Sequence, residues 1–594
     1  MPPAGIGSNK PVYAMTCLRR AALALLLAVA LCTPASAVAA ETVHLRIIAI
    51  NDFHGHLDPG DNALQVPHPD DPARMVALRS GGAAYLATRV RALRAEVRNS
   101  VFISTGDLVG ASPLVSALFR DEPTIEAMNL MGLDLNAVGN HEFDQGVAEL
   151  QRLAAGGCAT TPRGEVATCA HPSGRYDGAR FPFIAANVVD RDDRSLFAPS
   201  WVMSADGVRV GFIGAVTRST PGIVMPASIR GWRFLPEADA INREARRLRA
   251  LGVQALVAVV HEGGRTEGGF NDCANPEGPI FDIVRALDAG IDIVLSAHTH
   301  RGYTCRIDGR VVIQGGSFGR LVSVVDLDID RASGKVARER VRAANHPVPN
   351  GTDDGAEPAL RRAYPPLAAD PEVAAHVALY RARAEPLAAR PLGRIAQSFD
   401  RHPAAGGDHA AGRLVADAHL AATRSNGAQI AFTNPGGVRS ELAFRAPSGV
   451  VTFADAFQMQ PFGNSLVTLT LTGAQLKSLL EQQWSRRGEG VRFLQPSRGF
   501  SYAWYAGRPW GQRVDPDSMR LDGRRIQPDR RYRVTVNSFL AAGGDGFGLL
   551  RDAADPVGGP LDVVALADYL RRESEAGPLA PDRRPRIARI DGAP

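Results

Sequence analysis

The sequence lacks an excess of charge of either sign. Its 594 residues include 67 Lys and Arg against 62 Asp and Glu, which gives a formal net charge of +5. This near balance provides neither a basic stripe nor an acidic tail, so we predict that no nucleic-acid polymer is a partner. Internal repeats and extended low-complexity tracts are also absent. Because the chain is too long for one hydrophobic core, we expect two or three domains.

The apolar run near the N-terminus is too short for a membrane span. It covers Ala21–Leu31, whereas a spanning helix needs roughly 20 apolar residues. Arg19 and Arg20 precede the run and Pro34–Ala37 follows it with a small-x-small pattern, an arrangement typical of a signal peptide. We therefore predict that residues 1–40 are removed, leaving a periplasmic or secreted protein without stable membrane insertion. The alternatives are a retained anchor and a lipid attached at Cys32, against which the bulky Leu31 argues.

Cysteines are few, and two of the six, Cys17 and Cys32, would leave with the signal peptide. The other four form an even set, and four cysteines in an oxidising compartment allow three disulfide pairings. We predict Cys158 with Cys169, which closes a short Gly-rich loop, and Cys273 with Cys305. No CxxC spacing occurs, so a thiolate metal cluster is poorly supported.

Strand-like and helix-like segments alternate through the first half of the chain. This order predicts an α/β fold with a sheet covered on both faces and a ligand site at the carboxyl ends of its strands. Between residues 50 and 83 we expect a proline-containing loop. The expected strands are 44–50, 101–104, 134–138, 208–215, 255–260, 291–296 and 311–314, and the expected helices are 83–97, 117–131 and 238–251.

The periodic spacing of apolar residues ends around residues 341–370, which are rich in Pro, Gly, Ala and charged residues. We predict domains at residues 41–345 and 391–594, joined by a linker with a connecting helix at 346–390. In the second domain we expect helices at 411–423 and 473–484 and strands at 428–432, 466–471 and 531–536.

Polar side chains gather where five of the apolar runs end, in NDFHGH, GDLVGASP, GNHEFD, HEGG and SAHTH. A single histidine at a strand end is usually structural, but joint occurrence at successive strand ends favours one site. Four imidazoles, two carboxylates and an amide suit Zn, Mn, Fe or Co better than Mg or Ca. Seven ligands exceed the needs of one ion, so we predict two divalent ions bridged by a carboxylate. The candidate ligands are Asp52, His54, Asp107, Asn140, His261, His298 and His300.

The same motifs, in this order, resemble the calcineurin-like metallophosphoesterases, and within them the secreted 5′-nucleotidase and UDP-sugar hydrolase group. The resemblance implies a four-layer α/β/β/α domain followed by an α/β substrate-binding domain. It places Asp52, His54, Asp107 and His300 around one ion. It places Asp107, Asn140, His261 and His298 around the other, with Asp107 as the bridge.

His141 follows the ligand Asn140, and Asp144 lies three residues further on. At this spacing Asp144 can accept a hydrogen bond from His141 and fix its tautomer. We predict that a metal-activated water attacks phosphorus while His141 faces the leaving oxygen, the role that the resemblance also implies. The alternative is that Asp144 only caps the next helix.

The resemblance continues through the C-terminal half, where it implies nucleotide-binding residues. Arg439 is expected to clamp phosphate, because its planar fork matches phosphate oxygens. Arg401 resembles a second phosphate arginine, and Ala405 stands near the place of a third. Aromatic rings accept any base by stacking, although a Phe among apolar residues is more often core. The expected substrate-binding residues are Arg401, Asn434, Arg439, Phe462, Asn464, Phe539 and Asp545.

These features predict an exported two-metal phosphohydrolase that releases phosphate from nucleoside 5′-monophosphates and also from UDP-sugars. A 2′,3′-cyclic nucleotide phosphodiesterase and a sulfur-specific hydrolase are alternatives on the same fold. A catalytically silent nucleotide-binding surface protein is the alternative from another class.

Overall fold

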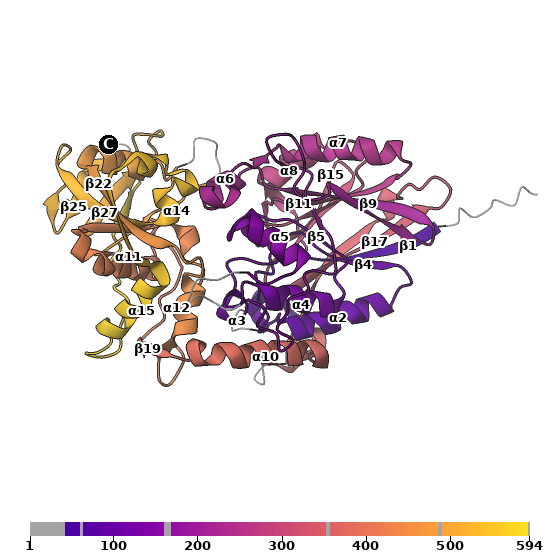
Figure 1. Ribbon diagram of the computed structural model, residues 1–594, viewed down its shortest axis with the longest axis horizontal. Helices are drawn as coiled ribbons and strands as arrows, with labels where there is room; N and C mark the ends of the chain where they lie inside the picture. The colour runs from indigo at the N-terminus through magenta and orange to yellow at the C-terminus, as the bar shows by residue number, and fades with distance from the viewer. Residues whose placement is uncertain (1–41, 60–62, 160–167, 352–356, 485–489, 592–594) are drawn as a thin grey trace, which may run out of the picture.

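The computed structural model describes residues 42–591 apart from 60–62, 160–167, 352–356 and 485–489. The predicted signal peptide and its two cysteines lie outside the described residues. Figure 1 shows the N-terminal half in indigo and magenta and the C-terminal half in orange and yellow.

Two six-stranded sheets pack face to face in the N-terminal half. The first runs in the order β18-β17-β1-β4-β5-β6 and the second in the order β15-β16-β14-β11-β9-β8. The first sheet consists of β1 (Thr42–Ile50), β4 (Ser100–Ser104), β5 (Leu135–Ala137), β6 (Phe183–Ile184), β17 (Leu321–Asp330) and β18 (Arg342–Pro347). The second consists of β8 (Ser200–Ala205), β9 (Val208–Val216), β11 (Ala255–His261), β14 (Ile293–Ser296), β15 (Gly302–Ile307) and β16 (Arg310–Gly315).

Side-chain alternation along β1 explains this packing. Leu45 and Ile47 point between the two sheets, whereas Ile48 and Ile50 point to the helices on the other face. Helices α2 (Ala83–Ala95), α4 (Glu122–Met131) and α5 (Val147–Ala155) cover that outer face, and α7 (Glu237–Ala250) and α8 (Pro279–Ala286) cover the second sheet (Figure 1). The α/β class and the four-layer order are confirmed. Each sheet has helices on one face only, because the other sheet covers its second face.

Two local predictions are wrong. The expected loop before residue 83 contains a hairpin of β2 (Ala63–His68) and β3 (Asp71–Arg79). The expected helix 117–131 is divided into α3 (Leu114–Ala117) and α4, because Arg120 and Asp121 have φ of 51° and 62° and Pro123 stands in the first turn of α4. Proline has no N–H to donate, so it is favoured in the first turn of a helix, where no N–H is needed.

Helix α10 (Pro371–Ala388) runs alongside the N-terminal half and leads into the C-terminal half (Figure 1). Its Tyr380 is fully buried and packs on Phe119, with ring centroids 5.0 Å apart. Strand β18 crosses the proposed boundary at residue 345, and the division into domains stays a proposal. Smaller elements of this half are β7 (Val188–Val189), β10 (Arg233–Phe234), β12 (Arg265–Glu267), β13 (Ala274–Glu277), α6 (Thr220–Ile223) and α9 (Pro358–Ala363).

A five-stranded sheet, ordered β23-β20-β27-β22-β28, and a four-stranded sheet, ordered β26-β25-β24-β29, form the C-terminal half. The five-stranded sheet consists of β20 (Ile430–Thr433), β22 (Ser465–Thr472), β23 (Gln495–Pro496), β27 (Arg531–Asn537) and β28 (Ala554–Leu561). The four-stranded sheet consists of β24 (Phe500–Tyr505), β25 (Val514–Leu521), β26 (Arg524–Arg525) and β29 (Ile587–Ile590). The remaining elements are α11 (Ala410–Ala422), α12 (Phe453–Met459), α13 (Gly473–Glu481), α14 (Ser538–Ala541), α15 (Asp562–Glu573), β19 (Pro391–Arg394) and β21 (Val450–Thr452).

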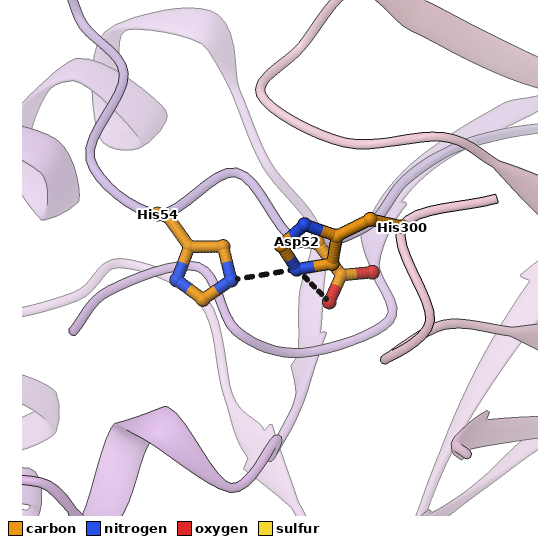
Figure 2. Close-up of side chains that lie close together, drawn as sticks. All are labelled: Asp52, His54 and His300. Atoms are coloured by element: carbon orange, nitrogen blue, oxygen red, sulfur yellow. Dashed lines mark hydrogen bonds and ion pairs between the residues drawn. The ribbon is translucent and has the colours of Figure 1, made fainter. Parts of the chain in front are cut away.

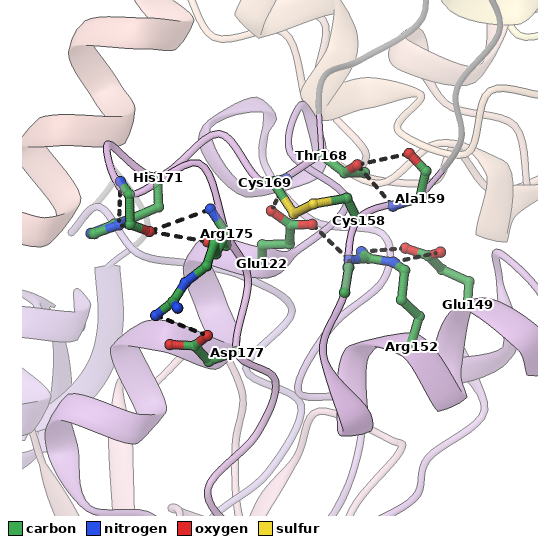
Figure 3. Close-up of a disulfide and its surroundings, with 12 residues drawn as sticks. Glu122, Glu149, Arg152, Cys158, Ala159, Thr168, Cys169, His171, Arg175 and Asp177 are labelled. Carbon is green, nitrogen blue, oxygen red and sulfur yellow. Dashed lines mark hydrogen bonds and ion pairs between the residues drawn. A yellow bond between two sulfur atoms is a disulfide. The ribbon is translucent and has the colours of Figure 1, made fainter.

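Both predicted disulfides are confirmed. Cys158 pairs with Cys169 and Cys273 with Cys305. Figure 3 shows the first bond above Glu122, whose carboxylate accepts a hydrogen bond from the Cys169 N–H at 2.7 Å. Among the described residues, no helix is long and apolar enough to cross a membrane.

Candidate metal centre

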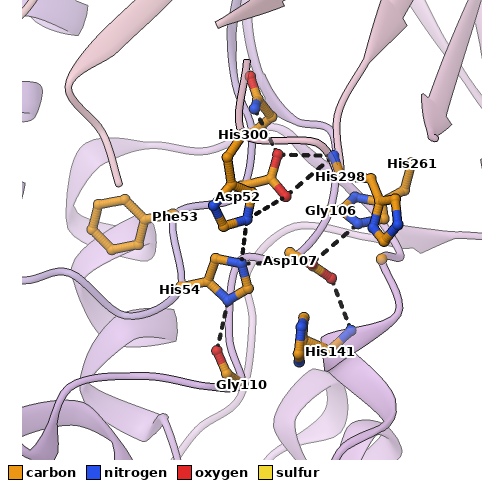
Figure 4. Close-up of polar contacts among 12 residues, drawn as sticks. Asp52, Phe53, His54, Gly106, Asp107, Gly110, His141, His261, His298 and His300 are labelled. Carbon is orange, nitrogen blue, oxygen red and sulfur yellow. Dashed lines mark hydrogen bonds and ion pairs between the residues drawn. The ribbon is translucent and has the colours of Figure 1, made fainter. Parts of the chain in front are cut away.

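The predicted metal ligands lie at the carboxyl ends of strands from both sheets. Residues 50 and 104 pair in register, as do 104 and 136, so β1, β4 and β5 end at one edge. In the second sheet β11 and β14 end together, with Val260 opposite Ser296. His261 is the last residue of β11, and the loops after the other four strands carry the other six predicted ligands. Figure 4 shows Asp52, His54, Asp107, His261, His298 and His300 gathered in one place.

The loop backbones are strained where they present these side chains. Positive φ angles occur at Asp52 (49°), His54 (47°), Asp107 (50°), His298 (73°) and His300 (56°). Left-handed backbone is unfavourable for residues with a side chain, and it persists only where the surroundings impose it, commonly at functional sites. The fold therefore holds these side chains in set positions.

The ligand atoms converge closely. The Nε2 atoms of His54 and His300 are 3.2 Å apart, and His300 Nε2 is 3.3 Å from Asp52 Oδ1 (Figure 2). On the other side of His54, the Asp107 Oδ2 atom is 3.6 Å from His54 Nε2 and 3.1 Å from His261 Nε2. Three overlapping groups of candidate metal-holding side chains result. Asp52, His54 and His300 lie on one side of Asp107, and Asp107 forms a group with His261 and His298 on the other. The third group consists of His54, Asp107 and His141 and lies between these two.

The donor atoms fit divalent ions. His54 Nδ1 and His261 Nδ1 each lie 2.8 Å from a backbone carbonyl oxygen, of Gly110 and Thr105. Since an Nδ1–H must donate there, each Nε2 lone pair points to the centre, as in metal-bound histidines. The Asn140 Oδ1 atom is buried without a hydrogen-bond partner in the described structure, and the buried His261 Nε2 atom has only the ion-pair contact with Asp107 Oδ2 at 3.1 Å. Such unpaired buried atoms are costly unless a cation satisfies them.

Glu142 is a residue of this site for which the sequence predicted no role. Its Oε2 atom accepts hydrogen bonds from the N–H groups of Asp107 at 2.9 Å and Gly139 at 2.8 Å. Its Oε1 atom accepts from the Leu108 N–H at 2.9 Å. One buried carboxylate thus joins the loop of Asp107 to the loop of Asn140. The position of an acidic residue directly after GNH does not by itself indicate that its carboxylate will accept hydrogen bonds from backbone N–H groups of another loop.

His141 lies beside the ligands and in contact with Asp144. Its Nδ1 is 2.8 Å from Asp144 Oδ2, and its backbone N–H donates to Asp107 Oδ1 at 2.8 Å. Burial lowers the pKa of His141, but the charges of Asp144 and Asp107 outweigh burial and raise it. The capping alternative for Asp144 is wrong, because α5 begins after Gly146 without a side-chain cap.

A cavity of about 270 Å³ joins this centre to the C-terminal half. We call it the base cavity. Asn140, His141 and His298 line one end, and Phe462 and Phe539 line the other. The rings of His141 and Phe462 are nearly parallel, with centroids 5.8 Å apart.

Polar contacts order the far wall of the base cavity. Asn434 Nδ2 donates to Asp545 Oδ2 at 2.7 Å, and Ser538 Oγ donates to Asn464 Oδ1 at 3.2 Å. Arg439 lies with its guanidinium carbon 5.7 Å from the Phe462 ring centroid. Arg401 does not line this cavity. Its Nη1 donates to the Arg439 carbonyl oxygen at 2.9 Å. Lining residues that the sequence did not predict include Met225, Arg492 and Asn537.

Comparisons with known proteins cover both halves of the chain. Residues 45–302 match the family model for calcineurin-like phosphoesterase, and residues 388–552 match that for the 5′-nucleotidase C-terminal domain. The chain is 32% identical to Endonuclease YhcR of Bacillus subtilis over 92% of its own length and 41% of that protein. It is 30% identical to Cell wall protein Lmo0130 of Listeria monocytogenes over 91% of its own length and 68% of that protein. It thus spans less than half of the first relative and about two thirds of the second.

A solved structure shows the same fold. The 5′-nucleotidase precursor from Thermus thermophilus superposes with a TM-score of 0.70 at 24% identity, covering 92% of this chain and 99% of that one.

Proposed function

The chain belongs to the calcineurin-like phosphoesterases that carry a 5′-nucleotidase C-terminal domain, and we propose that it releases phosphate from nucleoside 5′-monophosphates. The observation that carries the proposal is the base cavity, because residues expected to bind a nucleotide line it together with His141 and two metal-ligand candidates. A nucleoside held there has its 5′-oxygen directed to the metal centre.

Two metal ions would be held by the two groups around Asp107. Asp52, His54 and His300 would complete one site, and Asn140, His261 and His298 the other. Bound there, divalent ions would activate water and neutralise charge on the phosphate during an in-line displacement. The mixture of imidazole, carboxylate and amide donors suits Zn, Mn, Co or Fe.

His141 holds and delivers the proton that the leaving 5′-oxygen needs. With Nδ1–H donated to Asp144, only Nε2 is available to the substrate, and Asp144 stabilises the protonated ring. Arg439 supplies positive charge beside the phosphate, where a planar guanidinium matches its oxygens. These groups stabilise charge as it develops.

Substrate choice is assigned to the other wall of the base cavity. Phe462 and Phe539 offer ring faces to any base, while Asn434, Asn464 and Asp545 offer hydrogen-bonding groups. The expected range includes UDP-sugars. A phosphodiesterase acting on 2′,3′-cyclic nucleotides is the second candidate, favoured by the relative named an endonuclease.

We place the protein outside the cytoplasm, periplasmic or secreted. Two disulfides are stable in an oxidising compartment, and one relative is named a cell wall protein. Cleavage within residues 34–40 would leave a mature chain that starts just before β1. Mass spectrometry of the protein exported by a bacterial host would detect that N-terminus, and an intact N-terminus would contradict the assignment.

A substrate panel tests the proposal. Phosphate release is measured from AMP, UDP-glucose, 2′,3′-cAMP and an aryl phosphate with Mn, Co or Zn added in turn, and with Asp107→Asn as the inactive control. The expected result is the highest kcat/KM for AMP. A higher value for 2′,3′-cAMP would replace the nucleotidase by the phosphodiesterase, and no turnover of any phosphate ester would leave only a nucleotide-binding role.

A further inference from the structure

Arg492 lines the base cavity together with Phe539 and Asp545. The Phe539 ring packs against the backbone of Gly544, where an added Cβ atom would stand 2.4 Å from two atoms of that ring. Asp545 is the next residue, and its Oδ1 atom lies 3.9 Å from Arg492 Nε. Phe539, Asp545 and Arg492 therefore form one cluster, which we call the far edge of the base cavity.

The nearest charges distinguish Arg492 from Arg439, the other arginine of the base cavity. Arg439 interacts electrostatically with three carboxylates at or beside the metal centre, those of Asp52, Asp107 and Asp144. Arg492 instead interacts with Asp545. Arg439 is thus placed for the phosphate, whereas Arg492 stands beside one of the two rings between which the base would lie.

The backbone that carries Arg492 is fixed. The Arg492 N–H donates to the carbonyl oxygen of Gln483, two residues after the end of α13, at 2.9 Å. The Leu494 N–H donates to Gln483 Oε1 at 2.7 Å, and Gln483 is only 1% exposed. The Arg492 side chain, which is 35% exposed, therefore reaches the cavity from a rigid point.

The guanidinium of Arg492 keeps donors available for a ligand. Its contact with Asp545 at 3.9 Å is too long for a hydrogen bond. Within the described parts of the chain, neither Nη atom of Arg492 makes a hydrogen bond. Two neighbouring asparagines are already engaged, since Asn537 Nδ2 donates to Asn434 Oδ1 at 3.1 Å and Asn434 Nδ2 donates to Asp545 Oδ2 at 2.7 Å. The far edge thus offers N–H donors of Arg492 beside an acceptor, Asp545 Oδ1.

A donor beside an acceptor matches a base that carries a carbonyl oxygen next to a ring N–H. Guanine, hypoxanthine and uracil have this lactam edge. Adenine and cytosine have the reverse, an amino group next to a ring nitrogen without a proton. In the same orientation, their amino group would face the N–H groups of Arg492 and their bare ring nitrogen would face the Asp545 carboxylate. A site that leaves its polar groups unpaired in this way rejects the wrong base.

We propose that Arg492 and Asp545 read the edge of the base, so that GMP, IMP and UMP are preferred to AMP and CMP. This inference rests on the proposed function for the identity of the ligand. It goes beyond stacking on Phe462 and Phe539, which accepts every base. Arg492 is in this account a residue that determines specificity.

IMP and AMP are the matched pair for the test, because they differ only in the lactam edge. For the wild type, kcat/KM should be about tenfold higher for IMP than for AMP, near the lower end of base discrimination by arginine because this side chain is partly exposed. UMP should exceed CMP by a similar factor. The amide of Arg492→Gln can turn to suit either kind of base, so both ratios should fall to about one. Ratios near one in the wild type, or unchanged ratios in Arg492→Gln, would overturn the proposal.

Arg498→Gln is the control for loss of an arginine charge. Arg498 belongs to the same half, and its Nε also lies 3.9 Å from an aspartate, Asp417, but its side chain is 67% exposed and does not line the base cavity. This variant should keep both wild-type ratios. An equal fall of the ratios in Arg498→Gln would show an effect of net charge and contradict the role of Arg492.

Nucleoside binding separates this inference from the proposed function, because it needs no turnover. Calorimetry of the metal-loaded protein should find inosine bound about tenfold more tightly than adenosine, and Arg492→Gln should remove the difference. That result would support base selection even if neither IMP nor AMP were hydrolysed. Hydrolysis of both nucleotides, with equal affinities for inosine and adenosine, would keep the nucleotidase and overturn the selection of lactam bases.

Discussion

His141 and Asp144 offer the sharpest test of the chemistry, because their effects should depend on the leaving group. His141→Ala removes the imidazole but retains the backbone N–H that donates to Asp107 Oδ1. The metal ligands should therefore keep their places. Asp144→Asn keeps an oxygen that can accept from His141 Nδ1 at the observed 2.8 Å and removes only the charge.

The magnitudes follow from these contacts. Loss of a positioned proton donor costs about 10²- to 10⁴-fold in kcat. A charge-assisted hydrogen bond exceeds a neutral one by about 1–1.5 kcal/mol, so Asp144→Asn should lower kcat about tenfold. An aryl phosphate whose phenolate leaves without a proton should lose at most about tenfold in either variant.

The assay measures kcat for AMP and for 4-nitrophenyl phosphate at fixed metal content, which elemental analysis verifies for each variant. A large loss for AMP with a small loss for the aryl ester is expected from His141→Ala. Equal losses for both substrates at full metal content would refute protonation of the leaving oxygen, and turnover of AMP within a few-fold of wild type would remove His141 from the reaction.

Three further predictions concern other parts of the molecule. Phe462→Ala with Phe539→Ala should raise KM for AMP by about tenfold or more and leave KM for an aryl phosphate nearly unchanged, because stacking contributes about 1–3 kcal/mol per base. Equal effects in steady-state kinetics would exclude base stacking. In Glu142→Gln, at least one of the three backbone N–H groups that donate to the Glu142 carboxylate would face the N–H donors of the new amide. The metal affinity measured in a chelator titration should therefore fall about 10- to 100-fold. An affinity equal to that of the wild type would contradict the positioning role of Glu142. Burial raises the pKa of Glu126 from 4.5 to about 7, so the folded protein binds more protons than the unfolded chain in this interval and stability falls as pH rises through it. Glu126→Gln should therefore raise the free energy of unfolding by about 1–3 kcal/mol at pH 8 and by almost nothing below about pH 4. Urea unfolding at both pH values measures this difference, and a gain of the same size at both would exclude ionisation of Glu126 as its cause.

The sequence predicted those features that local pattern determines. The loops of Asp52, Asp107 and Asn140 were predictable, because apolar runs mark the strands and parallel strands end at one edge. The disulfide pairs were predicted correctly from the loops that they close. The hairpin before residue 83 was missed, because prolines in a solvated edge hairpin resemble a loop.

Other features depend on contacts between distant segments and leave no pattern. Glu142 binds backbone N–H groups, which every residue has, so nothing in the sequence of its partners identifies the contact. One cavity of about 600 Å³ is lined by Arg320 from one half and by Arg401 from the other half, some 80 residues away along the chain. The sequence also did not predict that a second sheet covers the first. A strand buried on both faces has the same apolar sequence pattern whether helices or another sheet cover it.

The most direct test of a two-metal nucleotide hydrolase is phosphate release from AMP as the metal content of the stripped protein is raised in steps. The two groups around Asp107 predict that turnover reaches its maximum at two ions per chain, and that Asp107→Asn, which weakens both sites, shows little turnover at any loading. Full turnover at one ion per chain, or no release from AMP at two, would contradict the proposed site and its function.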